Sequence, residues 1–246
     1  MKLLELEPKG RFVFVEDTHG DLTASIKVVE MHLNIDTKII FLGDYVDRGS
    51  DSKGNINYLL KKKAEDPDKI HLLQGNHETY CTLELSPADF WKNLKSNEKE
   101  KYHNIFKKFP LAVSVGDIVA LHGALPNIKK IEDINKIGEG ELDKNWMAML
   151  WGDFNEIRLG EGDESYDNRS GRPIYGKEYF NKIMKNLNKN VLIRSHQSDA
   201  NQVMFNNKCL TIFTSSAYWV KRTIAIADFN KKKRIMGVDD LVIEKI

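Results

Sequence analysis

Cysteine is nearly absent from this sequence, which holds two cysteines in 246 residues. Cys81 and Cys209 are too few for a disulfide framework, and they lack the spacing of a metal-binding cluster. An excess of one charge is also missing, because 37 basic residues stand against 36 acidic ones. A surface that binds nucleic acid or an anionic membrane would need such an excess. We therefore expect neither a disulfide-stapled fold nor a nucleic-acid or membrane partner.

Long apolar runs are equally scarce. The apolar start at Leu3 and Leu4 is broken at Glu5, too early for the core of a signal peptide. No later run approaches the length of a membrane span. We expect a cytoplasmic protein. A chain of this length with 41% hydrophobic residues can bury one core, so a single domain over residues 1–246 is expected.

What the sequence does contain is a repeated unit, a short apolar run followed directly by a polar loop. In the central example, the apolar run 39–42 predicts a buried strand. After Gly43 the loop supplies Asp44, Asp47 and Arg48. Carboxylates at the end of a buried strand are costly unless they pair or bind metal, although an acidic turn is the simpler alternative. Because the same unit recurs along the chain, we interpret these loops as parts of a ligand site and not as isolated acidic turns. Ligands bind at strand ends in open α/β sheets.

Two further units lie on either side of this one. A predicted strand over 11–15 precedes Asp17 and His19, which would point the same way because side chains two apart share a face. This pair is a plausible half-site for a divalent metal. The simpler alternative is an N-cap, at Asp21 or Thr23, for the helix predicted over 22–33, and both can hold. A strand over 69–73 ends before Asn76, a neutral oxygen ligand, and His77.

The remaining chain contributes mainly architecture. Gly116-Asp117 predicts a hairpin between strands 111–115 and 118–121. Apolar periodicity predicts an amphipathic helix over 87–109, interrupted near residue 96. A polar, glycine-rich stretch from 154 to 173 is expected to form a surface loop. The other predicted elements are helices over 50–64 and 177–187, strands over 190–195, 202–205, 209–213 and 222–227, and a final hairpin over 230–236.

Three loops together resemble the signature motifs of the phosphoprotein phosphatase family. They are Glu16-Asp-Thr-His-Gly20, Gly43-Asp-Tyr-Val-Asp-Arg-Gly49 and Gly75-Asn-His-Glu78. The second and third match at every position, whereas the first has Glu16 where the family has glycine. This family comprises metal-dependent serine/threonine phosphatases within the calcineurin-like metallophosphoesterases. The resemblance extends from Phe12 to Tyr218.

The resemblance implies a dinuclear metal site. Asp44 would bridge two divalent ions, of which Asp17 and His19 would complete one. Asn76, His122 and His196 would complete the other, with His122 and His196 each following a predicted strand. Mn²⁺ is the expected ion, and Fe, Zn and Co suit the same mixed ligands. Two such ions would activate water and hold the phosphoryl oxygens for in-line displacement.

The resemblance also implies how substrate is held. Arg48 and Arg169 would bind the phosphate by bidentate hydrogen bonds, with Asn76 and Tyr218 alongside. Arg169 is identified by counting back from Tyr175-Gly176, and Arg172 is the alternative. His77, oriented by Asp47, would protonate the leaving oxygen. The corresponding fold is a four-layer αββα sandwich of two mixed β-sheets flanked by helices.

A serine/threonine protein phosphatase is therefore the expected function, with a phosphoprotein or phosphopeptide as substrate. The alternative is a hydrolase of diadenosine tetraphosphate or other nucleotides on the same scaffold. A non-catalytic scaffold is a third reading, opposed by the presence of every predicted ligand. The chain lacks the extra segments of larger relatives, so we expect a monomer without an obligatory regulatory subunit.

Overall fold

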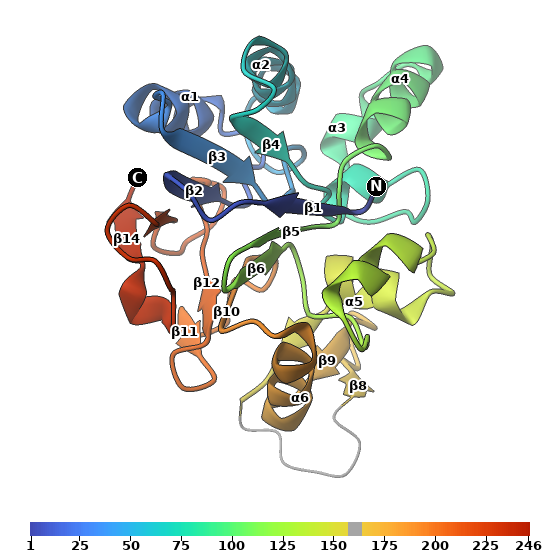
Figure 1. Ribbon diagram of the computed structural model, residues 1–246. Coiled ribbons are helices and arrows are strands. Elements are labelled where there is room, and N and C mark those ends of the chain that lie inside the picture. Colours follow the sequence, from blue (N-terminus) through green and yellow to red (C-terminus); the bar gives the residue numbers. More distant parts are fainter. Residues whose placement is uncertain (157–163) are drawn as a thin grey trace.

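Two β-sheets lie face to face at the centre of the computed structural model, which describes residues 1–156 and 164–246 (Figure 1). The first sheet has the order β1 (Leu3–Leu6), β5 (Ala112–Val115), β6 (Ile118–Leu121), β10 (Val191–Arg194), β12 (Cys209–Thr211), β11 (Val203–Met204). The second has the order β14 (Val242–Lys245), β13 (Thr223–Asp228), β2 (Arg11–Val15), β3 (Thr37–Phe41), β4 (Ile70–Leu72). Each sheet combines parallel and antiparallel pairs.

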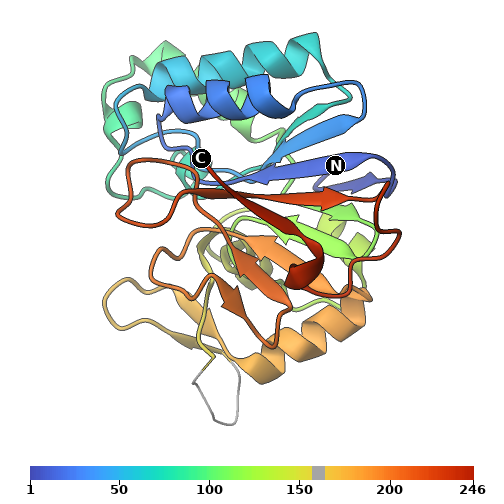
Figure 2. The same cartoon turned by 90° about the vertical axis from the view of Figure 1, so that its left-hand side faces the viewer.

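Helices cover the outer face of each sheet (Figure 2). The five-stranded sheet is covered by α1 (Leu22–His32), α2 (Ser52–Glu65), α3 (Asp89–Lys92) and α4 (Ser96–Phe106). The six-stranded sheet is covered by α5 (Lys144–Trp151) and α6 (Lys177–Leu187). Short 3₁₀ turns lie at η1 (His77–Thr79), η2 (Ile131–Lys136) and η3 (Val238–Asp240). The four layers confirm the predicted αββα sandwich.

The apolar strands are buried on both faces, which explains why they read as continuous hydrophobic runs. Along β2, Phe12 and Phe14 pack between the sheets, in one cluster with Ile193 of the other sheet. Val13 and Val15 face the opposite way, in the cluster beneath the helices. Because β2, β3 and β4 run parallel, their carboxyl ends meet at one edge. The loops predicted to carry the site are thereby brought together.

The segment expected to be a surface loop contains regular structure. β7 (Asp153–Phe154), β9 (Pro173–Tyr175) and β8 (Glu164–Tyr166) form a small third sheet. Aromatic packing stabilises it, since the ring of Phe154 lies 5.6 Å from that of Phe180 on α6. The prediction of a structureless loop to residue 173 is wrong at these strands. Its glycine-rich part, residues 160–163, lies outside the described residues.

The carboxyl end of the chain also differs from the prediction. The charged segment 230–236 forms turns, and the final strand β14 lies further on, antiparallel to β13. The turns let the last strand complete the five-stranded sheet at its edge. Within the described residues, no helix combines the length and apolarity needed to cross a bilayer.

Candidate metal centre

The loops at the strand ends hold their side chains with an unusual backbone. Asp17, His19, Asp44, Asp47, Arg48 and His196 all have positive φ, between 38° and 69°. Left-handed backbone is strained for residues other than glycine and persists where the surrounding structure enforces it. Strain concentrated on predicted site residues indicates that their side chains are held in place before any ligand binds.

Two of these loops approach each other too closely for side chains. A Cβ on Gly43 would lie 2.4 Å from the backbone nitrogen of Gly75, and one on Gly75 would lie 2.3 Å from Asp44 Oδ1. Glu78 also connects the two loops, because its side-chain oxygens accept hydrogen bonds from the backbone N–H groups of Asp44 and Tyr45 at 2.8 and 2.9 Å. Burial raises the pKa of Glu78 to about 8. The glycines and Glu78 thus fix Asp44 at the centre of the site.

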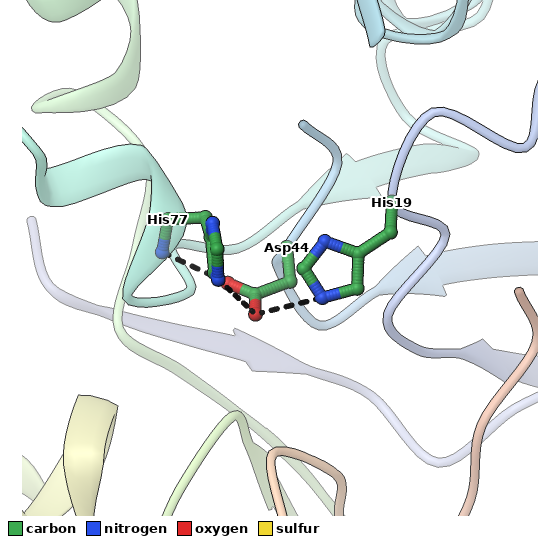
Figure 3. Close-up of side chains that lie close together, drawn as sticks. All are labelled: His19, Asp44 and His77. Carbon is green, nitrogen blue, oxygen red and sulfur yellow. Dashed lines mark hydrogen bonds and ion pairs between the residues drawn. The ribbon is translucent and has the colours of Figure 1, made fainter. Parts of the chain in front are cut away.

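Asp44 lies among three histidines, two of which, His19 and His77, are drawn with it in Figure 3. Its Oδ2 is 3.3 Å from His19 Nε2, 3.5 Å from His122 Nε2 and 3.9 Å from His77 Nε2. Burial opposes the charge of Asp44, but His122 and His77 overcome it and hold its pKa well below the ordinary value. An ionised carboxylate at this position can face two cations at once.

A second group of ligand atoms converges on the other side of Asp44. Asn76 Oδ1 lies 2.9 Å from His122 Nε2 and 3.1 Å from His196 Nδ1, and the two histidine nitrogens are 3.2 Å apart. Burial lowers the pKa of His122, and burial together with nearby Arg172 lowers that of His196. Both imidazoles are therefore neutral near pH 7, which is the form that binds metal.

On the first side, His19 has one nitrogen engaged and one directed inward. Its Nδ1 lies 2.7 Å from the carbonyl of Val46, so it carries the proton and donates to that oxygen. Its Nε2 faces Asp44 and, at 3.8 Å, Asp17 Oδ2. Burial opposes protonation of His19, but hydrogen bonding to Asp44 outweighs it and raises the pKa. A cation placed between these groups would replace that proton.

The donor set fits divalent metal ions. Ligands on one ion, each about 2.0–2.2 Å from it, lie roughly 3–4 Å apart, as these atoms do. Both oxygens of buried Asp17 lack hydrogen-bond partners, a costly state that a cation would relieve. Among the described residues, the ligand atoms of His19, Asp44 and His77 lie within 4.8 Å of one another, as do those of Glu16, Asp17 and His122.

His77 differs from the other histidines because a carboxylate orients it. Its Nδ1 lies 2.7 Å from Asp47 Oδ2, while Asp47 Oδ1 accepts the backbone N–H of Phe90 at 2.7 Å. The Trp91 indole N–H donates to the His77 carbonyl at 2.8 Å. The ring is thus held with Nε2 toward Asp44, at the rim of the ligand group. This arrangement suits proton transfer to a bound substrate.

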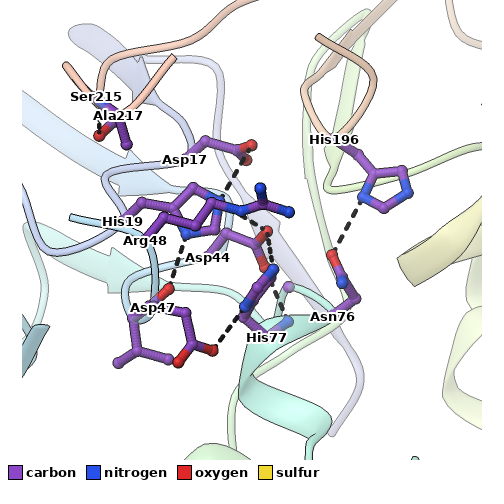
Figure 4. Close-up of polar contacts among 12 residues, drawn as sticks. Asp17, His19, Asp44, Asp47, Arg48, Asn76, His77, His196, Ser215 and Ala217 are labelled. Carbon is purple, nitrogen blue, oxygen red and sulfur yellow. Dashed lines mark hydrogen bonds and ion pairs between the residues drawn. The ribbon is translucent and has the colours of Figure 1, made fainter. Parts of the chain in front are cut away.

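Arg48 lies beside His19 (Figure 4), and the ring of Tyr218 lies next to both. The Tyr218 hydroxyl is 2.9 Å from His19 Nε2, and the Arg48 guanidinium lies 5.4 Å from the Tyr218 ring. Asp21 tethers the loop that carries Tyr218, because its Oδ2 accepts from Ser216 N–H and from Arg222. The weak sequence signal for Tyr218 thus coincides with a position next to a predicted ligand.

The predicted second arginine does not join this group. Arg169 lies exposed in a turn, where its backbone N–H donates to Asp167. Arg172, the alternative, reaches the site instead: its Nη1 is 3.8 Å from Asp153 Oδ2, and its charge lowers the pKa of His196. Arg169 lies within the turn and Arg172 lies after it, so the two side chains reach different places. Counting along the sequence cannot detect this difference.

Some residues that organise the site had no role in the sequence-based prediction. Glu78 holds the two loops around Asp44, although its place in the third motif could have pointed to it. Arg194 is fully buried and donates to the carbonyls of Gly123 and Gly152. It thereby connects the end of β10 to the segments that follow β6 and α5. No periodicity or motif spacing signals such long-range contacts.

A family model described as calcineurin-like phosphoesterase matches residues 10–199. The chain is 28% identical to a probable serine/threonine-protein phosphatase of Encephalitozoon cuniculi, over 88% of this chain and 49% of that protein. It is also 28% identical to a protein phosphatase 2A catalytic subunit of Dictyostelium discoideum, over 86% of this chain and 70% of that protein. It thus spans about half the length of the first relative.

A solved structure shares the fold. It is a protein serine/threonine phosphatase from Saccharomyces cerevisiae described as similar to human phosphatase PP5. The TM-score is 0.82 with 21% sequence identity, and the match covers 100% of this chain and 83% of that one. The arrangement of two central sheets with outer helices is therefore common to both.

Proposed function

The chain belongs to the calcineurin-like phosphoesterase family, and we propose that it is a metal-dependent phosphatase acting on phosphoserine and phosphothreonine in proteins. The observation that carries this proposal is the position of Asp44 between two groups of nitrogen ligands, with the His77–Asp47 pair alongside. The names of the two curated relatives support the choice of substrate. Residues 1–246 would form one catalytic domain.

In this proposal the chain holds two divalent ions. Asp17, His19 and Asp44 would bind one, and Asp44, Asn76, His122 and His196 the other. When bound, the ions would activate water as the nucleophile and neutralise charge on the phosphate. Mn²⁺ is the proposed metal, since the carboxylate and amide oxygens of the site suit it.

Arginines would position the phosphate opposite the attacking water. Arg48 stands at the rim next to Tyr218, with its guanidinium extending toward the centre of the site (Figure 4). We assign the second arginine as Arg172 in place of Arg169, because Arg172 lies beside Asp153 and His196. Two planar guanidinium groups can each form paired hydrogen bonds to phosphate oxygens. Asn76 and Tyr218 would supply further contacts.

His77 would complete the reaction by protonating the leaving oxygen. The Asp47 carboxylate accepts the Nδ1 proton, so Nε2 is the nitrogen that can deliver a proton toward the centre. Positioning and charge neutralisation then suffice for phosphoryl transfer to water, without a covalent intermediate on the protein. The serine or threonine hydroxyl would be released with this proton.

Substrate choice is tested by measuring phosphate release from a phosphoserine peptide and hydrolysis of diadenosine tetraphosphate in parallel. Each reaction is run with Mn²⁺ and then with chelator. We expect chelator-sensitive release from the peptide and little reaction with the nucleotide. Preference for the nucleotide would contradict the protein substrate while keeping the metal chemistry. Activity that survives chelation and dialysis would contradict the metal mechanism itself.

A further inference from the structure

Glu16 carries a carboxylate that is not among the proposed ligands of the two ions. It directly follows β2, is fully buried, and both of its side-chain oxygens lack a hydrogen-bond partner. Its backbone is fixed, because Glu16 N–H donates to Thr214 Oγ1 and its carbonyl accepts from Thr214 N–H. A buried carboxyl group without a partner is costly, so the side chain needs a donor or a cation close by.

The nearest ring nitrogen is one that also lacks a partner. Glu16 Oε2 lies 3.8 Å from His122 Nδ1, and this nitrogen is buried without a hydrogen bond. The opposite nitrogen of the same ring, Nε2, faces Asn76 at 2.9 Å and His196 at 3.2 Å. If Nε2 binds metal, the ring proton must sit on Nδ1 and requires an acceptor. Asp17 Oδ1 is slightly closer to this nitrogen, at 3.6 Å, but Asp17 is assigned to the other ion with His19, which leaves Glu16 as the carboxylate without another role.

We propose that Glu16 is a positioning residue whose carboxylate accepts the Nδ1 proton of His122 and holds Nε2 toward the ion shared with Asn76 and His196. This inference rests on the proposed metal centre. The contact would also join the two sheets beneath the site, since Glu16 follows β2 and His122 follows β6. A shift of less than an ångström brings the two atoms within hydrogen-bond distance. Carboxylate partners of this kind raise the basicity of the ligand and fix its orientation.

A third cation is the competing explanation for the same group. The ligand atoms of Glu16, Asp17 and His122 are close enough together to share an ion. Such an ion would take His122 Nδ1, however, while Nε2 faces the ligands of another ion. His122 would then have to lose both ring protons, whereas a neutral imidazole retains one. The positioning role needs no such loss.

The test uses the whole protein with Glu16→Gln, which keeps the shape, and Glu16→Gly. Calorimetric titration with Mn²⁺ gives the affinity of each ion, and elemental analysis gives the number bound. We expect the ion held by His122 to bind roughly 10- to 100-fold more weakly in Glu16→Gly, with a smaller loss in Glu16→Gln. The matched control is Glu244→Gln, which removes a carboxylate 3.3 Å from buried His32 on α1 and should leave both affinities unchanged.

A nuclear magnetic resonance experiment on the Zn²⁺-loaded protein reads the hydrogen bond itself. With ¹⁵N-labelled histidine, the wild type should show a downfield proton on His122 Nδ1 that moves upfield in Glu16→Gly. An unchanged resonance with unchanged affinities would overturn the positioning role. Three ions in the wild type and two in Glu16→Gln would overturn it in favour of a cation site. A wild type that binds no divalent ion would overturn the metal centre as well, so the two failures are distinguishable.

Discussion

Asp44 and His77 lie beside each other but should respond very differently to substitution. Asp44 Oδ2 stands within 3.5 Å of nitrogens from both ligand groups, so its loss removes the carboxylate that lies nearest to both of them. His77 is tied through Nδ1 to Asp47 and approaches Asp44 only at 3.9 Å. Substitution of Asp44, a ligand, should remove metal. Substitution of His77, the acid, should lower turnover and leave the metal in place.

His77→Asn is expected to keep the metal content while lowering turnover on a phosphoserine peptide roughly 100-fold or more. The reason is that asparagine cannot deliver the proton that the leaving oxygen needs. Steady-state kinetics and elemental analysis on the same sample provide the measurement. Unchanged turnover would rule out the acid role, and loss of metal would make His77 a ligand.

The two candidate arginines provide a second comparison at the residue scale. Arg172→Lys should raise KM for the phosphopeptide and lower kcat, because lysine cannot form the paired hydrogen bonds of a guanidinium. Arg169→Lys is the matched control and should change neither parameter, since Arg169 is exposed in its turn. The reverse pattern, with Arg169→Lys the damaging change, would restore the sequence-based assignment.

Residue by residue, the sequence was most informative where a side chain directly follows a strand. Asp17, His19, Asp44 and Asn76 come together because parallel strands end at a common edge, a rule that needs no structure. Arg172 could not be chosen over Arg169 in this way. Their positions depend on a turn closed by Asp167, whose side chain accepts from the N–H groups of two following residues.

At the level of elements, α5 connects stability to the site. Asp143 caps this helix by accepting from the N–H groups of Asn145 and Trp146, and it also accepts from Gly138. The helix ends at Trp151, two residues before Asp153, which lies near His196. A loosened cap would therefore shift the carboxylate beside a predicted ligand.

Asp143→Ala should destabilise the protein by about 1–2 kcal/mol, because the first turn of α5 loses its hydrogen-bond acceptor. The urea midpoint at pH 7 measures this change. Asp133→Ala on η2, a half-buried residue paired with exposed Lys136, is the control and should have a much smaller effect. Equal midpoints for Asp143→Ala and the wild type would show that the cap contributes little.

Elements with strong periodicity were predicted well from the sequence. The helix over 177–187 coincides with α6, and the hairpin at Gly116-Asp117 is formed by β5 and β6. The predicted break in the helix 87–109 is real, and it separates α3 from α4. By contrast, α5 and β14 were not predicted. Both are short, and both form through tertiary contacts, α5 against the six-stranded sheet and β14 along β13.

At the scale of the whole molecule, buried histidines make stability depend on pH. His71 on β4 is buried, and burial with the nearby charge of Lys63 lowers its pKa to about 4, from an ordinary value of about 6.5. Between these values the unfolded chain carries a proton at this residue that the folded protein does not. The unfolded state therefore binds more protons, and stability falls as the pH falls through this window.

His71→Gln should reduce the slope of unfolding free energy against pH between about 6.5 and 4. The full contribution of His71 is on the order of 3 kcal/mol, because its pKa is lowered by roughly 2.5. The slope should shrink without vanishing, because the pKa values of His32, His122 and His196 are also lowered. Urea titrations at several pH values test this, with His103→Gln on α4 as control; an unchanged slope would contradict it.

The whole fold followed from the sequence only through its resemblance to known proteins. Spacing along the chain allowed several α/β layouts, because it does not specify which strands pair. The order β1-β5-β6-β10-β12-β11 brings together strands that are far apart in sequence. The site depends on this topology, since His122 and His196 come from one sheet and Asp17 and Asp44 from the other.

The most direct test of the proposed centre is the low-temperature electron paramagnetic resonance spectrum of the protein loaded with Mn²⁺. The carboxylate of Asp44, shared by the two ions, would hold them close enough for their spins to couple. We predict a spin-coupled pair in the wild type and loss of that signal in Asp44→Asn. A spectrum of isolated Mn²⁺ ions in the fully loaded wild type would contradict a shared dinuclear site.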